Sequence, residues 1–498
     1  MKQYFLFFLI GGMLLLTVTS KSQEASKKVL SLSEAIALAN EASLEAFRIK
    51  NLYLSSYWEY RSFKAERLPS LSLNLTPAKY QSYLVERYIS ELDRDEYRKQ
   101  QSFYSYGNLS IQQNLDCTGG TFYIDSELGY LRTFGASNAT QYSSVPIRIG
   151  YSQTLVGYNS FKWEKRIEPL KYERAKKELL YNMEDMAEQA TTYFFNLALA
   201  EAKCQLAIDN LASCDTLYQM GELRHELAAL SKADLLTLNL EKINAENTLL
   251  SNTSSKKRAM FSLLSFLNLT KDTNLELKLP TSPSSCLILP AEALQKAKDN
   301  NPEFLAQRQN VLEAEQALDK VKKQRYVEAS VSASIGFNQV SNTLSKAYVK
   351  PMQQDIVSVG LSIPLVDWGV RKGKCNMANN NLNIIKTTAE QETQSVEEEV
   401  VMTVTDFNIQ QKIVISTEKA LDLSILAYNE TRERFIIGKT DLNSVTLAHN
   451  RQQQAQENFL IALRDYWIYY YKIRKLTLFD FDLNISLANK FDYENYLK

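Results

Sequence analysis

Apolar and polar residues alternate with a period of two in four short stretches of the chain. Each stretch has an apolar side chain at every second position and a small or polar residue between. The stretches lie near residues 70–76, 145–155, 329–337 and 356–363. This pattern predicts strands with one apolar and one polar face, about as long as the strands of a membrane β-barrel. A half-buried strand of a soluble sheet alternates in the same way, so both interpretations stay open on the pattern alone.

Two much longer stretches repeat every seven residues instead. The first register includes Met183, Ala190 and Leu197, and the second includes Val400 and Phe407. Each stretch is free of proline and holds one glycine. A strict seven-residue period predicts left-handed coiled-coil packing, here of two long helical hairpins at residues 170–268 and 374–476. An arm of about 50 residues would reach ~75 Å, which is long for a globular domain.

The order of these elements is given twice. Glu34 and Arg67 match Glu292 and Arg325 at a spacing of 258 residues (292 − 34 and 325 − 67), whereas Arg224 matches Arg434 at a spacing of 210 (434 − 224). The first copy therefore carries 48 extra residues (258 − 210) between about 76 and 146. A duplicated unit of this size favours an assembly with pseudo-symmetry over a pocket enzyme.

The extra residues of the first copy contain a second kind of strand signal. Two alternating runs flank Gly119 and Gly120, which predicts a hairpin at residues 103–134. Residues 81–101 are charged and rich in tyrosine, and we interpret them as a loop or short helix. The chain would then have about four strands, or six if the hairpin joins the same sheet. The sequence leaves that choice open.

The N-terminus indicates export. A short polar start is followed by an apolar run from Tyr4 to Val18 and by small residues at Thr19 and Ser20. This is the arrangement of a secretory signal peptide, and the apolar run is shorter than the ~20 residues that a spanning helix needs. The predicted organisation is a signal peptide at 1–20, a first repeat at 21–280, a second repeat at 281–480 and a C-terminal tail at 481–498.

Composition and motifs argue against most chemistry. The 57 basic and 57 acidic residues balance, so nothing attracts nucleic acid. Five scattered cysteines without a CxxC motif do not suggest a disulfide framework, and the two histidines, His225 and His449, are isolated. We find no metal-binding, nucleotide-binding or catalytic motif. The sequence therefore predicts no enzyme activity, no cofactor and no metal site.

The order of elements resembles the TolC-type outer-membrane efflux protein family over nearly the whole mature chain. The most specific stretch runs from Arg434 through Gly438 to Val445, which is similar to the family's helix-tip segment. Its counterpart in the first copy is residues 224–236. Residues 363–369, Ile-Pro-Leu-Val-Asp-Trp-Gly, are similar to the family's turn from strand to helix, and residues 153–159 are its partner.

The resemblance implies a fold class and partners. We expect a mixed, mainly α fold: a duplicated TolC-like repeat with long coiled-coil hairpins and a membrane β-barrel. In that family three chains of four strands close one twelve-stranded barrel in the outer membrane, continued by a helical tunnel in the periplasm. Four strands are too few to close a membrane barrel, so several chains must share one. The resemblance also implies a periplasmic adaptor protein and an inner-membrane transporter as partners, besides outer-membrane lipid.

The resemblance implies site residues at the two helix tips. The expected adaptor-contacting residues are Leu227, Ala228, Ala229, Leu230, Ile437, Gly438, Lys439 and Thr440. The family's tunnel can be closed by carboxylates shortly after the second tip, but the aligned positions here hold Ser444 and Leu447. Asp234 and Asp441 remain as candidates for the pore constriction, although aspartate is also favoured at any helix start.

The sequence therefore predicts a passive exit duct of a tripartite efflux or type I secretion system. An inner-membrane pump would drive it through the adaptor, and the transported substrate stays open. The alternative is a periplasmic or surface coiled-coil scaffold or adhesion protein, whose strands would carry no lipid-facing apolar band.

Overall fold

The computed structural model describes residues 28–90, 93–134, 138–227, 231–270, 273, 275–280, 286–437, 439–440 and 442–493. The predicted signal peptide at residues 1–20 lies outside this part of the chain. Two compact units divide the chain. The first takes in Met1–Leu44, Met186–Pro283 and Ile413–Trp467, and the second takes in Glu45–Asp185, Ser284–Lys412 and Ile468–Lys498. Each unit draws residues from both predicted repeats, so the repeats are not separate compact bodies.

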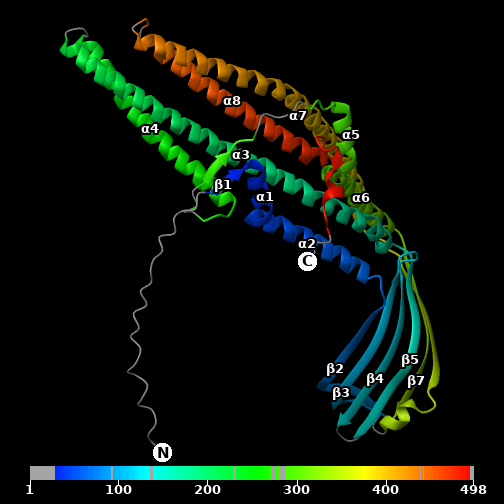
Figure 1. The fold of residues 1–498 in the computed structure, drawn as a ribbon. Helices are drawn as coiled ribbons and strands as arrows, with labels where there is room; N and C mark the ends of the chain where they lie inside the picture. The colour runs from blue at the N-terminus through cyan, green and yellow to red at the C-terminus, as the bar shows by residue number, and fades with distance from the viewer. Residues whose placement is uncertain are drawn as a thin grey trace, which may run out of the picture. The chain divides into compact units, whose positions relative to one another are not determined.

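Two long helical hairpins dominate the fold (Figure 1). The first consists of α3 (Ser160–Glu226) and α4 (Lys232–Phe266), and the second of α7 (Val370–Ile436) and α8 (Leu442–Thr477). Their starts are 210 residues apart (370 − 160 and 442 − 232). Helix α3 begins ten residues before the predicted start at 170 and contains Pro169 (170 − 160). Pro169 is the tenth residue of α3, so the helix runs through this proline although a proline in a helix interior removes one backbone hydrogen bond.

The seven-residue register marks the buried side of these hairpins. Ala190, Leu197, Phe407 and Val414 are fully buried. Within the first unit, polar contacts accompany this packing: the side chain of Asn252 donates to the carbonyl of Lys203 at 3.1 Å. The Cys204 thiol also lies 3.8 Å from the Thr253 hydroxyl, so a position of the predicted register lies at the contact between α3 and α4.

The first unit also contains a small element beside the hairpins. Strand β1 (Lys28–Ser31) pairs in parallel with β6 (Leu275–Lys278). Ser31 then caps α1 (Leu32–Ala42) in a reciprocal capping box with Glu34.

The second unit has a base of shorter helices. They are α2 (Leu44–Ala65), α5 (Pro290–Asn300) and α6 (Pro302–Lys323). Helices α5 and α6 repeat α1 of the first unit and α2 at a spacing of 258 residues (290 − 32 and 302 − 44). Asn301 caps α6 through the backbone N–H of Glu303, and its side-chain amide donates to the carbonyl of Leu476 at the end of α8, at 2.9 Å. One asparagine thereby terminates one helix and begins another.

The second unit also contains one antiparallel six-stranded sheet in the order β2-β3-β4-β5-β7-β8 (Figure 1). Its strands are β2 (Ser70–Ile89), β3 (Arg94–Leu115), β4 (Gly120–Phe134), β5 (Ala139–Val156), β7 (Glu328–Ser341) and β8 (Met352–Ser362). A 3₁₀ turn, η1 (Leu344–Tyr348), connects β7 to β8. The inserted hairpin thus joins the main sheet, and the count is six strands, not four.

The interpretation of residues 81–101 as a loop or short helix is wrong. Most of this segment lies in β2 and β3, which pair from Gln81 with Ser102 out to Ile89 with Arg94. Tyrosines and charges share both faces there, so no apolar alternation reveals the strands. Backbone pairing with the neighbouring strand decides the conformation instead.

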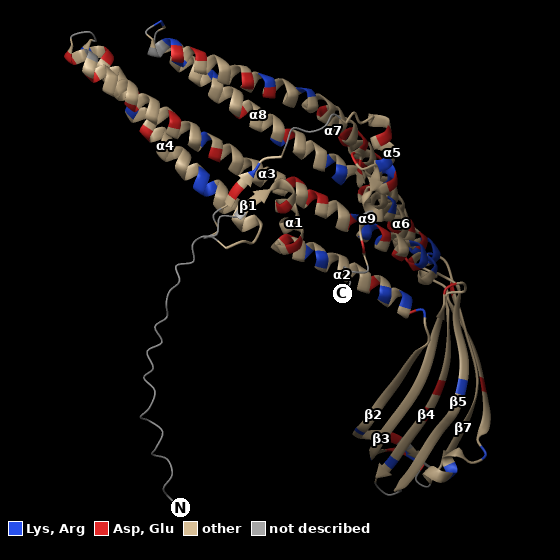
Figure 2. Ribbon diagram, viewed as in Figure 1, with Lys and Arg blue, Asp and Glu red and all other residues tan. Residues whose placement is uncertain are grey.

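The chain ends with β9 (Phe479–Asp480), β10 (Ile485–Ser486) and α9 (Leu487–Lys490). Charged residues are spread along the helices, whereas the sheet carries few of them (Figure 2). None of the helices in the described part of the chain combines the length and the apolar character needed to cross a membrane.

Candidate functional site

The six-stranded sheet has two chemically different faces. Leu71, Ile111, Ile124, Ile149 and Ile335 are cross-strand partners from β2 to β7, so they point to the same side. The next rows of this apolar face add further aliphatic side chains. The exposed apolar residues that we assign to this face are Leu71, Leu73, Leu75, Leu109, Ile111, Phe122, Ile149, Ile335, Phe337, Val357, Val359 and Leu361.

This apolar face is uncovered. Leu73 on β2 is 61% exposed and Val359 on β8 is 69% exposed, although they lie at opposite edges of the sheet. Such a large continuous apolar surface is unfavourable in water and marks contact with lipid or protein. The exposed face spans every strand, as a lipid-facing band would.

The opposite face is polar. Ser72 of β2 pairs with Ser110 of β3, and Ser110 pairs in turn with Asp125 of β4. Asp125 then pairs with Arg148 of β5, which pairs with Gly336 of β7. The division into faces therefore follows the period-two pattern of the sequence.

Both outer edges of the sheet, β2 and β8, lack a neighbouring strand within the described chain. All adjacent pairs are antiparallel, so with six strands β2 and β8 run in opposite directions. An edge strand presents unpaired N–H and C=O groups, which cannot remain unsatisfied in hydrocarbon. A second sheet of the same kind could pair antiparallel with either edge.

The turns between sheet and helix use the same device in both copies. The Asn159 side chain accepts a hydrogen bond from the backbone N–H of Lys162 at the start of α3. The Asp367 carboxylate accepts from the N–H groups of Gly369 and Arg371 at the start of α7, and these bonds lower the pKa of Asp367. Gly369 has a φ of 88°, a conformation that glycine adopts readily.

The aromatic residues after the strands fall into two groups. Trp163 packs inward, and its indole N–H donates to Asp319 of α6 at 2.9 Å. Trp368, in contrast, is 96% exposed. The first has a packing role, whereas the second suits the aromatic belt of a bilayer edge.

Arg67 fastens the inserted hairpin to the helical base. Its guanidinium lies 3.2 Å from the carboxylate of Asp116 in the β3–β4 turn and donates to the carbonyl of Phe63 in α2 at 3.0 Å. Gly119 completes this turn with a φ of 75°.

The helix tips are described in part. Leu227 is 80% exposed and Ile437 is 64% exposed, while Lys439 is exposed and Thr440 is half-buried. The predicted tip residues Ala228, Ala229, Leu230 and Gly438, and the predicted constriction residue Asp441, lie outside the described residues. Two large apolar side chains therefore stand in solvent, one at each tip.

Asp234 lies in the first turn of α4. Its backbone N–H donates to the Ser231 hydroxyl at 3.1 Å, and the same hydroxyl donates to the Asp234 carboxylate at 2.6 Å. The aspartate is exposed and takes part in a helix cap. Asp234 thus helps to cap the start of α4 through Ser231, and its side chain is also exposed to solvent.

Sequence reasoning missed two ionic clusters. One joins Arg474 of α8 with Glu184 and Asp480, and the other joins Arg148 of β5 with Asp125 and Glu127. The second had a signal in the sequence, because Asp125 and Glu127 are two residues apart in a predicted strand and must share a face. The first joins residues 290 positions apart, and no local pattern predicts such a pair.

No group of three potential metal ligands occurs among the residues that the structure describes. His449 lies beside the Tyr428 ring, with 5.4 Å between the ring centres, and burial lowers its pKa.

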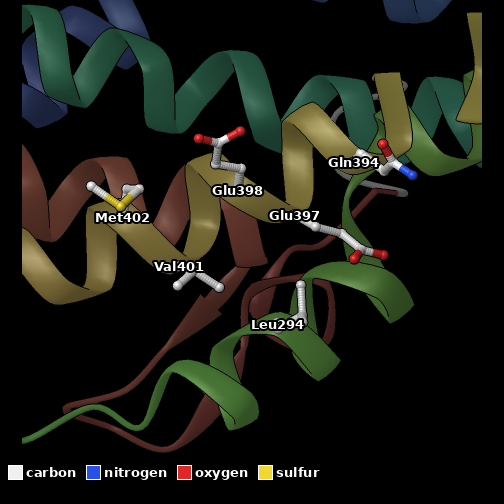
Figure 3. Close-up of a pocket in the computed structure, with 6 residues that line it drawn as sticks. All are labelled: Leu294, Gln394, Glu397, Glu398, Val401 and Met402. Atoms are coloured by element: carbon white, nitrogen blue, oxygen red, sulfur yellow. The ribbon is translucent and has the colours of Figure 1, made fainter. Parts of the chain in front are cut away.

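A shallow surface cavity of about 440 Å³ lies between α5 and α7 (Figure 3). Its lining is mixed: Leu294, Val401 and Met402 lie beside Glu397 and Glu398, and Glu397 is paired with Lys298 at 2.8 Å. This surface has no arrangement typical of a catalytic pocket.

The comparisons with known proteins agree with this architecture. Residues 293–477 match the model of the family described as outer membrane efflux protein. No curated protein matches the sequence. Among solved structures, the chain is similar to the CmeC outer membrane channel of Campylobacter jejuni, with a TM-score of 0.65 and 11% identity over 93% of this chain and 90% of that one.

Two further structures have the same fold. A membrane protein from Pseudomonas aeruginosa gives a TM-score of 0.63 at 13% identity over 90% of each chain. The open state of the MtrE outer membrane channel of Neisseria gonorrhoeae gives 0.59 at 14% identity, over 90% of this chain and 88% of that one. The predicted resemblance is thereby confirmed: residues 293–477 match the model of the outer membrane efflux protein family, and the chain has the fold of TolC-type outer-membrane channels.

Proposed function

We propose that this protein is the outer-membrane channel of a tripartite efflux or type I secretion system. The observation that carries the proposal is the two-faced sheet, whose apolar face is exposed on every strand and whose other face is polar. Lipid would contact the first face and water the second. The family match over residues 293–477 supports the same function. A coiled-coil scaffold would not need such an apolar face.

Several chains close one barrel. A six-stranded sheet is smaller than the eight strands of the smallest membrane barrels, and its two free edges require partners. Three copies, as in the family, give a barrel of eighteen strands (3 × 6), in which β8 of one chain pairs with β2 of the next. Each chain contributes six strands, which is two more than the four that the resemblance implied. The barrel then has an even number of strands, so all of its neighbouring strands can pair antiparallel.

The helical hairpins continue this barrel as a tunnel in the periplasm. Neighbouring chains also need to meet along their helices. A groove of about 650 Å³ between α6 and α7 is lined by Phe304, Val311, Leu312 and Ala389 together with charged residues. A helix of the adjacent chain would cover these apolar side chains, which supports the homotrimer.

A periplasmic adaptor binds the tips, and an inner-membrane transporter supplies the energy. The contact residues are those at and beside the two turns: Leu227, Ala228, Ala229, Leu230, Ile437, Gly438, Lys439 and Thr440. The exposure of Leu227 and Ile437 supports this assignment, since exposed apolar anchors are typical of binding surfaces. The channel itself is passive, without catalysis or cofactor.

Opening is an iris-like shift of the hairpins between two packing arrangements. Asp234 and Asp441 are the candidate constriction residues, one on each hairpin. Asp234 also caps α4, so replacing it with asparagine removes charge while keeping a residue that can cap. Such a variant separates the role of the carboxylate in the pore from its role in the helix.

Fractionation followed by electrical recording tests the proposed function. The protein should be extracted from the outer membrane by detergent as a trimer, and it should conduct ions in a planar bilayer. A protein recovered as a soluble monomer in the periplasm, with no conductance after reconstitution, would instead support the scaffold.

A further inference from the structure

An ion-paired triad lies on the polar face of the sheet, away from the helix tips. The guanidinium of Arg148 on β5 donates from Nε to Oδ1 of Asp125 at 3.1 Å, and its second nitrogen contacts both Asp125 and Glu127. Both carboxylates belong to β4, and Asn108 of β3 donates to Glu127 at 3.4 Å. Two acidic groups and one basic group leave one net negative charge per chain at neutral pH.

The surroundings of the triad are uncharged. Its rows of the polar face contain Ser72, Asn74, Ser110, Asn108, Val145, Gly336 and Gln354. The row on the helix side contains Ser70, Gln112, Tyr123, Gly150, Ser334 and Ile356. Among these described positions the triad supplies all of the charge. Its electrostatic field is therefore not offset by a neighbouring residue in these rows.

The backbone is shaped around Arg148. The pairing of β5 shifts between Ser144 and Arg148, where β5 has one residue more than β7. Gly336 of β7 lies opposite, and a Cβ at this glycine would approach the Arg148 Cα to 2.9 Å and the Ile147 carbonyl to 2.8 Å. A bulge and a glycine together hold Arg148 against the two carboxylates.

The triad depends on the inserted hairpin. Arg148 lies on β5, which has a counterpart in the second copy, but Asp125 and Glu127 lie on β4, which has none. The 48 additional residues thus add two carboxylates to the wall as well as two strands. In the second copy Gly360 of β8 and its neighbours on the polar face provide no equivalent cluster.

We propose that Asp125, Glu127 and Arg148 form a charged belt that gives the lumen of the barrel a preference for cations and cationic solutes. This inference rests on the proposed function, because only a closed channel places the polar face around a lumen. Three chains bring three net negative charges into one ring. Rings of carboxylates favour cations in channels, and low-dielectric walls strengthen the effect. Arg148 moderates it by pairing with both acids.

A local chemical probe tests the belt without depending on the helix tips. Asn74 is exposed on the polar face and is two strands away from Glu127 in the same row, about 10 Å. We would introduce Asn74→Cys into a chain whose five native cysteines are replaced by serine. The rates of modification by a cationic and an anionic methanethiosulfonate of similar size are then measured in outer-membrane vesicles at low salt.

The cationic reagent should react faster than the anionic one. Glu127→Gln should lower the ratio of the two rates about two- to fourfold, and Arg148→Gln should raise it by a similar factor. Arg148→Lys keeps the positive charge and should leave the ratio of the two rates unchanged. It therefore separates the effect of the charge from any effect of Arg148→Gln on folding. Asp355→Asn removes one carboxylate from the opposite, apolar face and serves as the matched control.

The possible outcomes distinguish the charge preference of the belt from the proposed channel function. A ratio near one that none of these substitutions moves would overturn the belt, and the triad would then be only a structural ion pair. If neither reagent reaches Cys at position 74 and the protein does not conduct, the proposed channel itself fails. Conductance with an unchanged ratio contradicts the further inference alone.

Discussion

Arg474 of α8 donates a hydrogen bond to Glu184 of α3 at 2.8 Å, although the two residues are 290 positions apart in the sequence. The same guanidinium donates to Asp480 at 3.0 Å, just after α8 ends. These contacts tie the first hairpin to the second within one compact unit. Glu184 and Asp480 raise the pKa of Arg474 against the opposing effect of burial, so the side chain stays charged.

Removing this cation should strongly destabilise the base of the hairpins. Arg474→Met removes the positive charge beside two poorly solvated carboxylates, and breaking such a buried ion pair typically costs about 3–5 kcal/mol. Arg474→Lys restores the charge and should recover part of the loss. Denaturant unfolding monitored by tryptophan fluorescence measures both. Equal stability of the wild-type protein and Arg474→Met would show that the cluster does not hold the base.

Asp319 should make stability depend on pH in the acidic range. Burial opposes its charged form, but the hydrogen bonds from Trp163 and Lys323 outweigh burial and lower the pKa of Asp319 below its ordinary value of 3.8. A lowered pKa means that this stabilisation is present above pH 3.8 and is lost as the pH falls through the folded-state pKa. Asp319→Asn should flatten the acid limb of a plot of Tm against pH. An unchanged limb would exclude this contribution.

His449 should favour its neutral form in the folded protein, whereas Asp319 favours its charged form. Burial lowers its pKa below the ordinary 6.5, and the negative charge of Asp209 compensates only in part. At pH values between the folded-state pKa and 6.5, the unfolded chain binds more protons than the folded chain. The stability should therefore fall as the pH decreases from about 6.5. His449→Gln should remove this slope. A histidine that titrates at 6.5 or above by NMR in the folded protein would contradict the prediction.

Much of the architecture followed from periodicity, and the remainder did not for identifiable reasons. Ala190, Leu197 and Phe407 are buried because the seven-residue period and the helix geometry coincide. Leu73 and Val359 are exposed on one face because the period of two fixes their direction. Local patterns carried this information completely.

The missed features depend on long-range pairing. The strand between Tyr83 and Ile89 shows no apolar alternation, and only its register against β3 makes it a strand. The Arg474–Glu184 pair depends on how two repeats pack, which no sequence window contains. Of the candidate site, Leu227 and Ile437 are exposed just beyond the ends of α3 and α7, and their role in adaptor binding stays a prediction. The triad around Arg148 could not be predicted without the strand order.

The two faces of β2 should respond oppositely to a new charge. Leu73→Arg places a guanidinium in the lipid-facing band, which costs about 2–4 kcal/mol near the bilayer centre, so less trimer should reach the outer membrane. Ser72→Arg is the matched variant one residue away. It faces the lumen, and it should assemble normally while reducing conductance. Equal loss of trimer in both variants would contradict the assignment of the faces.

The central claim is that three copies close one membrane wall by pairing β8 with β2, and disulfide cross-linking tests it most directly. In a chain without native cysteines, single cysteines at Leu71, Leu73 or Leu75 are combined with one at Val357, Val359 or Leu361, since all six share the apolar face. At least one combination should give covalent trimers in outer-membrane fractions under mild oxidation. Pairing Ser72→Cys with the same β8 positions should give none, because the side chains point to opposite faces. No cross-link in any same-face combination, with the protein remaining monomeric, would contradict the account.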